Sequence, residues 1–191
     1  MTKSTRERML AGAAQMIATR GLAGTSVREL AEFARVPRGS TYHHFPGGKD
    51  QLVDEALGYV SERIRGHLEQ ARTEGPEAAV GAFLESWRTI LVDSAFQSGC
   101  PVLAVATVEG PEGETAAHRA AAEAFRSWQA LLAEVFEESG VPATRAASLS
   151  WTVIALLEGA VVLCRSTRSI EPLDRVEVEL RGLLAAALGS D

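Results

Sequence analysis

Apolar side chains recur at intervals of three and four residues along most of the chain, and this spacing predicts amphipathic α-helices. The first helix is expected over residues 4–20, where Met9, Ala13 and Ile17 share one face. Gly21 follows directly, and a glycine at this place is a common helix stop. The chain therefore begins with one well-delimited helix.

Two short helices are predicted next. Ser26 and Glu29 have the S-x-x-E spacing of a capping box, in which each side chain satisfies a free backbone N–H, so a helix is expected over 26–34. Pro37 interrupts the pattern and is tolerated in the first turn of a further helix, expected over 38–45. Two helices joined by so short a turn form a helix-turn-helix.

The rest of the sequence keeps helical spacing between prolines and glycines. A fourth helix is expected to follow the turn at 46–48 and to reach about residue 72. Later helices are expected at about residues 76–93, 100–108, 113–139, 142–166 and 172–188. No strand pattern competes, so we predict an all-α fold of about nine helices, with a head at 1–48 and a larger body at 49–191.

Charge is divided unevenly between these two parts. Residues 1–49 contain eight Lys or Arg and three Glu, a balance of +5. The whole chain has 19 basic and 25 acidic side chains, so residues 50–191 carry eleven and 22, a balance of −11. A basic head on an acidic body is typical of a module that binds a polyphosphate, although uneven charge without function is the alternative.

Hydrogen-bonding side chains are concentrated in the second helix of the helix-turn-helix. Such a helix enters the major groove of DNA, where these groups would contact base edges and phosphates and Gly39 would let the backbone come close. The helix N-terminus at Lys49 favours a phosphate. The side chains that suit this contact are Arg38, Ser40, Thr41, His43 and His44.

Two segments resemble the N-terminal signature of the TetR family of bacterial repressors: TSVRELA at 25–31 and GSTYHHF at 39–45. YHHFPGGK at 42–49 and GCPV at 99–102 are similar to the LmrA/YxaF-like branch. The resemblance implies a homodimer, paired through the last two helices, that binds an operator in double-stranded DNA. It also implies a small-molecule effector in the larger domain that moves the fourth helix and releases the DNA.

The resemblance assigns phosphate contacts to Thr25, Tyr42 and Lys49, and places Arg38, Ser40, Thr41 and His43 near bases. The full set of expected DNA-binding residues is Thr25, Ser26, Arg28, Arg38, Gly39, Ser40, Thr41, Tyr42, His43, His44 and Lys49.

Two positions depart from the family pattern. Arg35 stands where the family commonly has Gly, and Pro37 stands where it commonly has a capping Ser. A non-glycine residue in a left-handed conformation costs roughly 1–2 kcal/mol, so we expect either strain at Arg35 or a turn of different geometry.

The aromatic residues of the body are candidates for an effector pocket, although their spacing equally fits an ordinary core. Glu158 lies in an apolar helix, where a carboxylate is costly unless it is paired, solvated or reserved for a ligand, and of these we expect solvation. An aromatic-lined pocket would favour a hydrophobic or aromatic effector. The candidate ligand-binding residues are Phe83, Trp87, Phe96, Cys100, Phe125, Trp128, Trp151 and Glu158.

Several other sites are excluded by their chemical requirements, and we expect no catalytic residue, metal or cofactor. GGKD at 47–50 lacks the Ser/Thr and first glycine of a phosphate loop. His43 and His44 point about 100° apart on a helix and have no third ligand at a zinc spacing. Cys100 and Cys164 form neither a zinc nor a redox motif, and nothing places Cys100 beside His118 as a nucleophile and base.

The sequence also predicts where the protein is located and leaves two other functions open. The longest uncharged stretch spans 15 residues, 94–108, whereas a membrane span requires about 20, so no membrane contact and a cytoplasmic location are expected. The charged N-terminus does not resemble a signal peptide. The alternatives are an all-α enzyme that binds a phosphorylated cofactor and a DNA-binding protein indifferent to sequence.

Overall fold

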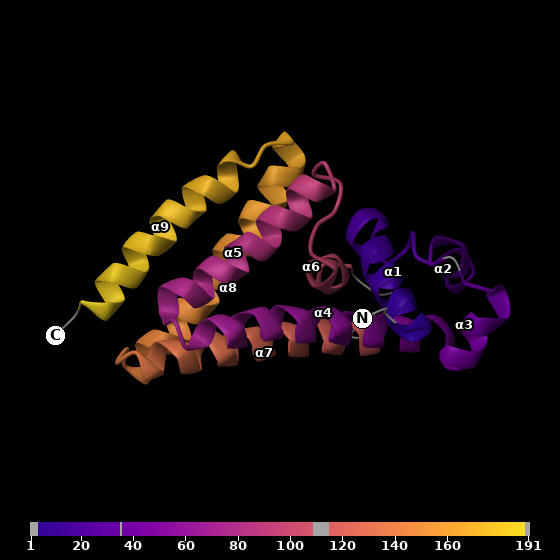
Figure 1. Ribbon diagram of the computed structural model, residues 1–191, viewed down its shortest axis with the longest axis horizontal. Helices are drawn as coiled ribbons and strands as arrows, with labels where there is room; N and C mark the ends of the chain where they lie inside the picture. Colours follow the sequence, from indigo (N-terminus) through magenta and orange to yellow (C-terminus); the bar gives the residue numbers. More distant parts are fainter. Residues whose placement is uncertain (1–3, 35, 109–114, 190–191) are drawn as a thin grey trace. The chain divides into compact units, whose positions relative to one another are not determined.

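The computed structural model describes residues 4–34, 36–108 and 115–189, and within them it contains nine helices and no strand (Figure 1). This confirms the predicted all-α fold. The helices are α1 (Thr5–Arg20), α2 (Val27–Phe33), α3 (Arg38–His44), α4 (Gly48–Arg72), α5 (Pro76–Asp93), α6 (Pro101–Ala106), α7 (Ala116–Glu138), α8 (Ala143–Thr167) and α9 (Glu171–Leu188).

Both ends of α1 are set by local backbone chemistry. At its start, Ser4 Oγ accepts a hydrogen bond from the Glu7 N–H, and the Glu7 carboxylate accepts one from the Ser4 N–H. This capping box was not among the sequence expectations, although Ser4 and Glu7 have the required spacing. At the other end, Gly21 adopts φ 74° and donates to the Ile17 carbonyl, which confirms the predicted stop.

The starts of α2 and α3 differ in part from the expectation. Ser26 Oγ accepts from the Glu29 N–H at 3.2 Å, but the Glu29 carboxylate accepts from the Ser26 hydroxyl instead of the Ser26 N–H. The predicted capping box is therefore only half formed. Pro37 is the N-cap residue of α3 and makes no side-chain cap hydrogen bond. The expectation about Arg35 lies outside the described residues.

The chain forms two compact units, each built from two separate segments. One unit consists of Met1–Glu62 and Cys100–Ala124, and the other of Arg63–Gly99 and Phe125–Asp191. Helices α4 and α7 each contribute to both units. The domain boundary predicted between residues 48 and 49 stays a prediction.

The first unit is built around α1, which packs against both α2 and α6. Met9, Leu30 and Phe45 are fully buried in its core. A Cβ atom on Gly12 would lie 3.2 Å from the side chains of Leu30 and Phe33, so the absence of a side chain there permits the close packing of α1 on α2. The core thereby holds α2, the first helix of the helix-turn-helix, against the longer α1.

The core of the second unit contains an aromatic cluster. Trp128 of α7 packs edge-to-face against Phe83 of α5, with ring centroids 5.7 Å apart, and against Phe125 at 5.5 Å. Such edge-to-face pairs are more favourable than burial of the same area alone. Trp87, one turn after Phe83, is 1% exposed. The Phe83–Trp128 pair joins α5 to α7 in this core.

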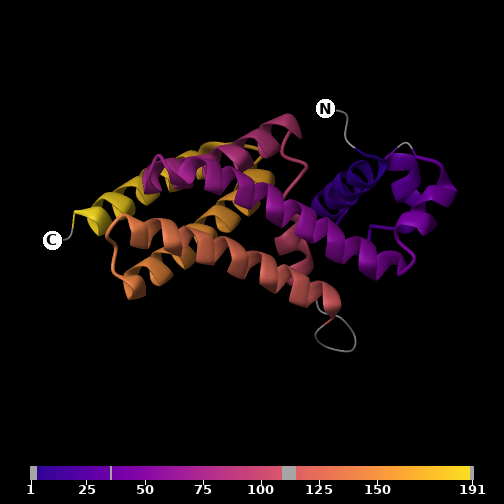
Figure 2. The same ribbon diagram turned by 60° about the horizontal axis from the view of Figure 1, so that its bottom comes forward.

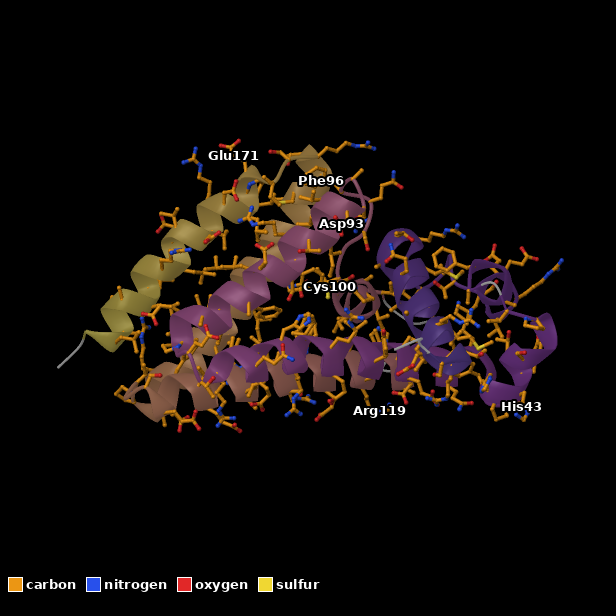
Figure 3. The ribbon with its side chains drawn as sticks, in the orientation of Figure 1. His43, Asp93, Phe96, Cys100, Arg119 and Glu171 are labelled. Atoms are coloured by element: carbon orange, nitrogen blue, oxygen red, sulfur yellow. The ribbon has the colours of Figure 1, made fainter. Side chains whose placement is uncertain are left out.

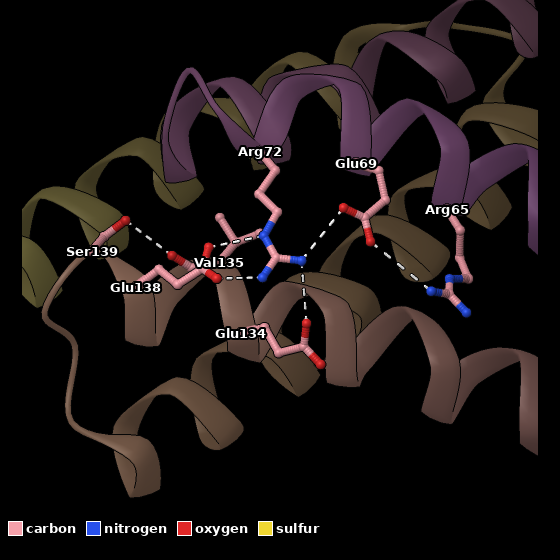
Figure 4. A network of polar contacts seen from close by, with 7 residues as sticks. All are labelled: Arg65, Glu69, Arg72, Glu134, Val135, Glu138 and Ser139. Carbon is pink, nitrogen blue, oxygen red and sulfur yellow. Dashed lines mark hydrogen bonds and ion pairs between the residues drawn. The ribbon is translucent and has the colours of Figure 1, made fainter.

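Ion pairs join the C-terminal parts of α4 and α7, which lie side by side in Figures 1 and 2. Arg72 of α4 donates through Nε to Glu138 at 2.9 Å and pairs with Glu134 at 3.3 Å, while Glu69 holds it from its own helix at 3.4 Å (Figure 4). The hydrogen bond from Arg72 lowers the pKa of the Glu138 carboxyl, and the same bond raises the pKa of Arg72. The network is solvent-exposed.

Helices α8 and α9 form an antiparallel pair (Figure 1). Arg88 of α5 donates to Asp174 at 2.6 Å and to Glu177 at 2.9 Å, which fastens α9 to α5. Helix α8 is long and apolar enough to cross a membrane by length and composition, which the sequence expectation did not foresee. Half of its most apolar window is buried inside the fold.

Candidate nucleic-acid interface

Helices α2 and α3 pack against each other as a helix-turn-helix. The turn is closed by a hydrogen bond of 2.9 Å from the Val36 N–H to the Ala31 carbonyl. Leu30, Ala31 and Val36 are buried on the inner side of the motif, and Phe45 closes the end of α3. This packing leaves the opposite side of α3 open to solvent.

The open side of α3 presents polar and aromatic groups without any acidic residue. Tyr42 is 66% exposed, which is unusual for a large aromatic side chain, and Gly39 and His43 are also exposed. Ser40 and His44 are partly exposed. These residues lie on one short helix, as expected, and the side chain of Arg38 lies outside the described part of the chain.

Thr41 faces the other way. It is 1% exposed, and its hydroxyl has no hydrogen-bond partner among the described residues. A base contact was expected for Thr41, but its side chain packs toward the core and does not share the open side with Tyr42 and His43. The family signature does not reveal this, because both faces of α3 carry small hydroxyl residues.

Thr25 and Ser26 have structural partners of their own. Thr25 is 1% exposed, and its hydroxyl donates to the Gly21 carbonyl at 3.0 Å, which fixes the turn after α1. Ser26 caps α2. Arg28, by contrast, is exposed in the first turn of α2. The phosphate contact expected for Thr25 therefore falls on a buried hydroxyl that is already in use.

Lys49 joins two elements of the first unit. Its ammonium donates to the Leu22 carbonyl at 2.8 Å, which ties the start of α4 to the turn after α1. Two of its three N–H bonds are not needed for this contact. Lys49 is half-buried and lies in the first turn of α4.

Arg6 is a positioning residue that the sequence expectations did not include. Its guanidinium pairs with Glu55 of α4 and lies 5.6 Å from the centre of the Phe45 ring. A cation over an aromatic face is attracted by the ring quadrupole. Arg6 thus links the start of α1 to the end of α3 and to α4. A basic residue in the first turn of a helix gives no sequence signal of such a contact.

The candidate effector residues do not all gather in one place. Trp128 contacts both Phe83 and Phe125, and Trp87 lies one turn after Phe83 on α5. The indole N–H of Trp87 is buried and has no hydrogen-bond partner among the described residues. Such an unsatisfied donor is uncommon in a folded protein, because it costs about 1–3 kcal/mol.

Two candidates differ from the expectation. Trp151 is 45% exposed on α8, so it does not line a buried pocket. Glu158 is 6% exposed, so the expectation that this carboxylate is solvated is wrong. Both follow from the orientation of α8, whose inner and outer faces are both apolar in sequence.

Phe96 and Cys100 lie between α5 and α6 (Figure 3). Phe96 is half-buried and has a positive φ of 62°. Cys100 is buried, and its sulfur accepts a hydrogen bond from the Leu103 N–H at the start of α6. Cys100 is thus a helix cap, and a role in effector binding stays a prediction.

Two family models match this chain. "Bacterial regulatory proteins, tetR family" matches residues 9–56, and "Transcriptional regulator LmrA/YxaF-like, C-terminal domain" matches residues 76–179.

Individual proteins agree with this result. An uncharacterized HTH-type transcriptional regulator of Mycobacterium tuberculosis is 37% identical over 96% of this chain and 95% of its own length. The HTH-type transcriptional regulator LmrA of Bacillus subtilis is 30% identical over 88% of this chain and 90% of its own. A TetR transcriptional regulator from Legionella pneumophila has the same fold, with a TM-score of 0.82, 21% identity and coverage of 95% and 97%. These matches and the exposed helix-turn-helix show that this chain is a DNA-binding transcriptional regulator of the TetR family, of its LmrA/YxaF-like branch, and members of this family are regulators and not enzymes.

Proposed function

We propose that this protein is a dimeric repressor that binds an inverted-repeat operator and releases it when a small molecule binds the second unit. The observation that carries the proposal is the open side of α3, which presents Tyr42 and His43 to solvent without an acidic neighbour on that helix. A helix of this kind reads the major groove, while basic residues beside it contact phosphates.

We assign base contacts to Ser40 and His43 on this open side, and phosphate contacts to Arg28, Tyr42 and the free N–H bonds of Lys49. Arg38 keeps the base contact expected from its position in the sequence. Thr41 and Thr25 support the motif from inside, because both side chains are buried. Gly39 would let a phosphate or base edge approach the backbone of α3, since open space surrounds it.

The dimer contact is proposed for the outward face of α8. A solvent-facing helix of a monomeric protein normally carries charge, and an uncharged face of this length is typical of an interface. Helix α9, which packs along α8, adds Val178, Gly182, Ala185 and Ala186. The exposed residues of α8 between 148 and 166 are all uncharged: Ser148, Trp151, Ala155, Gly159, Val162, Leu163 and Ser166.

A second copy of the chain suits this surface best. A twofold axis pairs identical patches, so one apolar face is enough to build the contact. Two helix-turn-helix motifs held in this way would meet half-sites about 34–36 Å apart, one turn of DNA.

The effector is proposed to bind near Trp87. A ligand with a hydrogen-bond acceptor and an apolar, aromatic body would satisfy the buried indole N–H and contact Phe83 and Trp128. Such a ligand lowers DNA affinity only if it binds the DNA-free conformation more tightly.

Selection of bound duplexes from a random DNA pool by the full chain tests the proposal. An enriched inverted repeat, bound by two chains, is the expected result, and the same duplex then serves to screen apolar aromatic compounds for release. Steep salt dependence without an enriched sequence would instead indicate a DNA-binding protein indifferent to sequence. No binding to any duplex would contradict the proposal.

A further inference from the structure

The segment between α5 and α6 holds two consecutive non-glycine residues in the left-handed backbone region. Ala95 has φ 50° and Phe96 has φ 62°. Each such residue costs roughly 1–2 kcal/mol. Strain of this kind persists only where neighbouring groups hold it in place. Residues 94–99 form this segment, the connector. Figure 3 shows the position of Phe96 in it.

Part of the strain is explained by the way α5 ends. The Phe96 N–H donates to the Leu91 carbonyl at 2.7 Å, and the Ala95 N–H donates to the Val92 carbonyl at 3.0 Å. These two bonds form a Schellman motif, whose left-handed position is usually occupied by glycine. Ala95 occupies it here. The motif does not require a second left-handed residue, so Phe96 needs a different explanation.

Arg165 of α8 contacts the connector through its guanidinium group. Its Nη2 donates to the Gln97 carbonyl at 3.0 Å. A Cβ atom on Gly99 would lie 2.7 Å from Nη1 of the same guanidinium, so Arg165 in this position occupies the space that a side chain at residue 99 would need. Within the connector, the Ser98 N–H donates to Ser94 Oγ at 3.1 Å. Arg165 therefore connects α8 to the connector by a hydrogen bond to Gln97 and lies directly against Gly99.

The chain enters α6 directly after this contact. Cys100 caps α6, and α6 packs against α1, the helix on which the helix-turn-helix is built. Arg165 itself lies in the last turn of α8. Arg165 of α8 thus contacts the connector, the connector is covalently joined to α6, and α6 packs against α1.

We propose that Arg165 is a positioning residue that holds the connector in its strained conformation and so fixes the start of α6. If α8 rearranged, the contact between Arg165 and the connector would weaken. The connector would then change conformation, and the start of α6 would change with it. Any effect of Arg165 on DNA binding rests on the function proposed above. The contact of Arg165 with the connector and its effect on α6 do not depend on that function.

Hydrogen exchange of the free, full-length protein tests the proposal. In Arg165→Gln, peptides that cover the connector and the first turn of α6 should exchange at least tenfold faster, because the contact with Gln97 is lost. Arg145→Gln, an exposed arginine at the other end of α8, is the matched control and should leave these peptides unchanged. If Arg165→Gln does not fold, Arg165→Lys replaces it, since lysine keeps the charge but not the fork of donors.

A second substitution separates positioning from a general loss of packing. Gly99→Ala would displace the guanidinium, so alone it should accelerate exchange as Arg165→Gln does. In the Arg165→Gln background it should have no further effect, because the side chain it displaces is already gone. Three results would overturn the proposal. The first is that Arg165→Gln exchanges at the wild-type rate, and the second is that faster exchange is confined to the connector and does not reach α6. The third is that the effects of the two substitutions on the exchange rate are fully additive.

DNA affinity gives an independent measurement. With the duplex enriched by selection, Arg165→Gln should bind at least threefold more weakly than Arg145→Gln, and equal affinities would overturn the link to the head. If selection enriches no duplex, the proposed repressor function fails, while the exchange measurements still decide the role of Arg165.

Discussion

The ammonium group of Lys49 donates a hydrogen bond to the backbone carbonyl of Leu22, with 2.8 Å between Nζ and the oxygen. Leu22 belongs to the turn after α1, and Lys49 belongs to the first turn of α4. One side chain therefore fixes the start of α4, and we propose that its remaining N–H bonds contact a DNA phosphate. The two roles have separate experimental consequences.

Replacement of Lys49 by methionine should lower both stability and DNA affinity. Loss of the hydrogen bond to Leu22 should cost about 1 kcal/mol in the free energy of unfolding. Loss of a phosphate contact should reduce the slope of log K against log salt by about 1. Arg28→Met is the control. It should reduce the slope of log K against log salt by the same amount as Lys49→Met but leave the denaturation midpoint unchanged. An unchanged midpoint for Lys49→Met would contradict the structural role.

Gly39→Ala should stabilise the protein and weaken DNA binding. No atom lies within 4 Å of the position of an added Cβ, and alanine is favoured over glycine in a helix by about 0.5–1 kcal/mol. Gly66 of α4 is equally open, so Gly66→Ala should give a similar rise in Tm. Only Gly39→Ala should lower the affinity for the selected duplex. Equal affinities of the two variants would show that DNA does not approach α3 at Gly39.

Thr41→Val should not change sequence preference. The Thr41 hydroxyl is buried without a partner among the described residues, so its replacement by a methyl group of the same shape should leave Tm unchanged or raise it. Ser40→Ala, on the partly exposed neighbour, should change the sequence enriched by selection. An altered operator preference for Thr41→Val would show that Thr41 contacts bases after all.

Leu163→Glu should prevent dimer formation. Leu163 is 54% exposed on the uncharged face of α8, and two buried carboxylates facing each other across a twofold axis would strongly oppose association. Val92 on α5 is also 54% exposed, so Val92→Glu is a matched control that should remain dimeric. Light scattering after size-exclusion chromatography distinguishes the two masses. A dimeric Leu163→Glu would place the interface elsewhere.

Glu138→Gln should lower Tm at neutral pH and have no effect in acid. Arg72 lowers the pKa of Glu138 below its ordinary value of 4.5, so the ion pair stabilises the fold above that pH and is lost as the pH falls through the lowered value. The difference in Tm from wild type should therefore shrink below pH 4.5, and it should also shrink in high salt. Glu137→Gln, the adjacent exposed residue, should show no such dependence. A constant difference at all pH values would contradict the assignment.

The sequence alone determined the helices and the family. Helical periodicity depends on which residues can face a common core, so it is visible without coordinates, and Gly21 ends α1 because glycine adopts φ 74° without steric cost. The signature segments at 25–31 and 39–45 identify the helix-turn-helix because its short turn links residues that are close in sequence.

Only the tertiary structure decided which side each residue faces and which distant groups meet. Ser40 and Thr41 are chemically alike, yet packing buries only Thr41. Trp151 lies outside because α8 has two apolar faces, and periodicity does not tell which one meets α5. Ala95 and Phe96 adopt left-handed conformations without a glycine to mark them. The contact of Arg165 with Gln97 joins residues far apart in the chain, and such contacts exist only once the helices have packed.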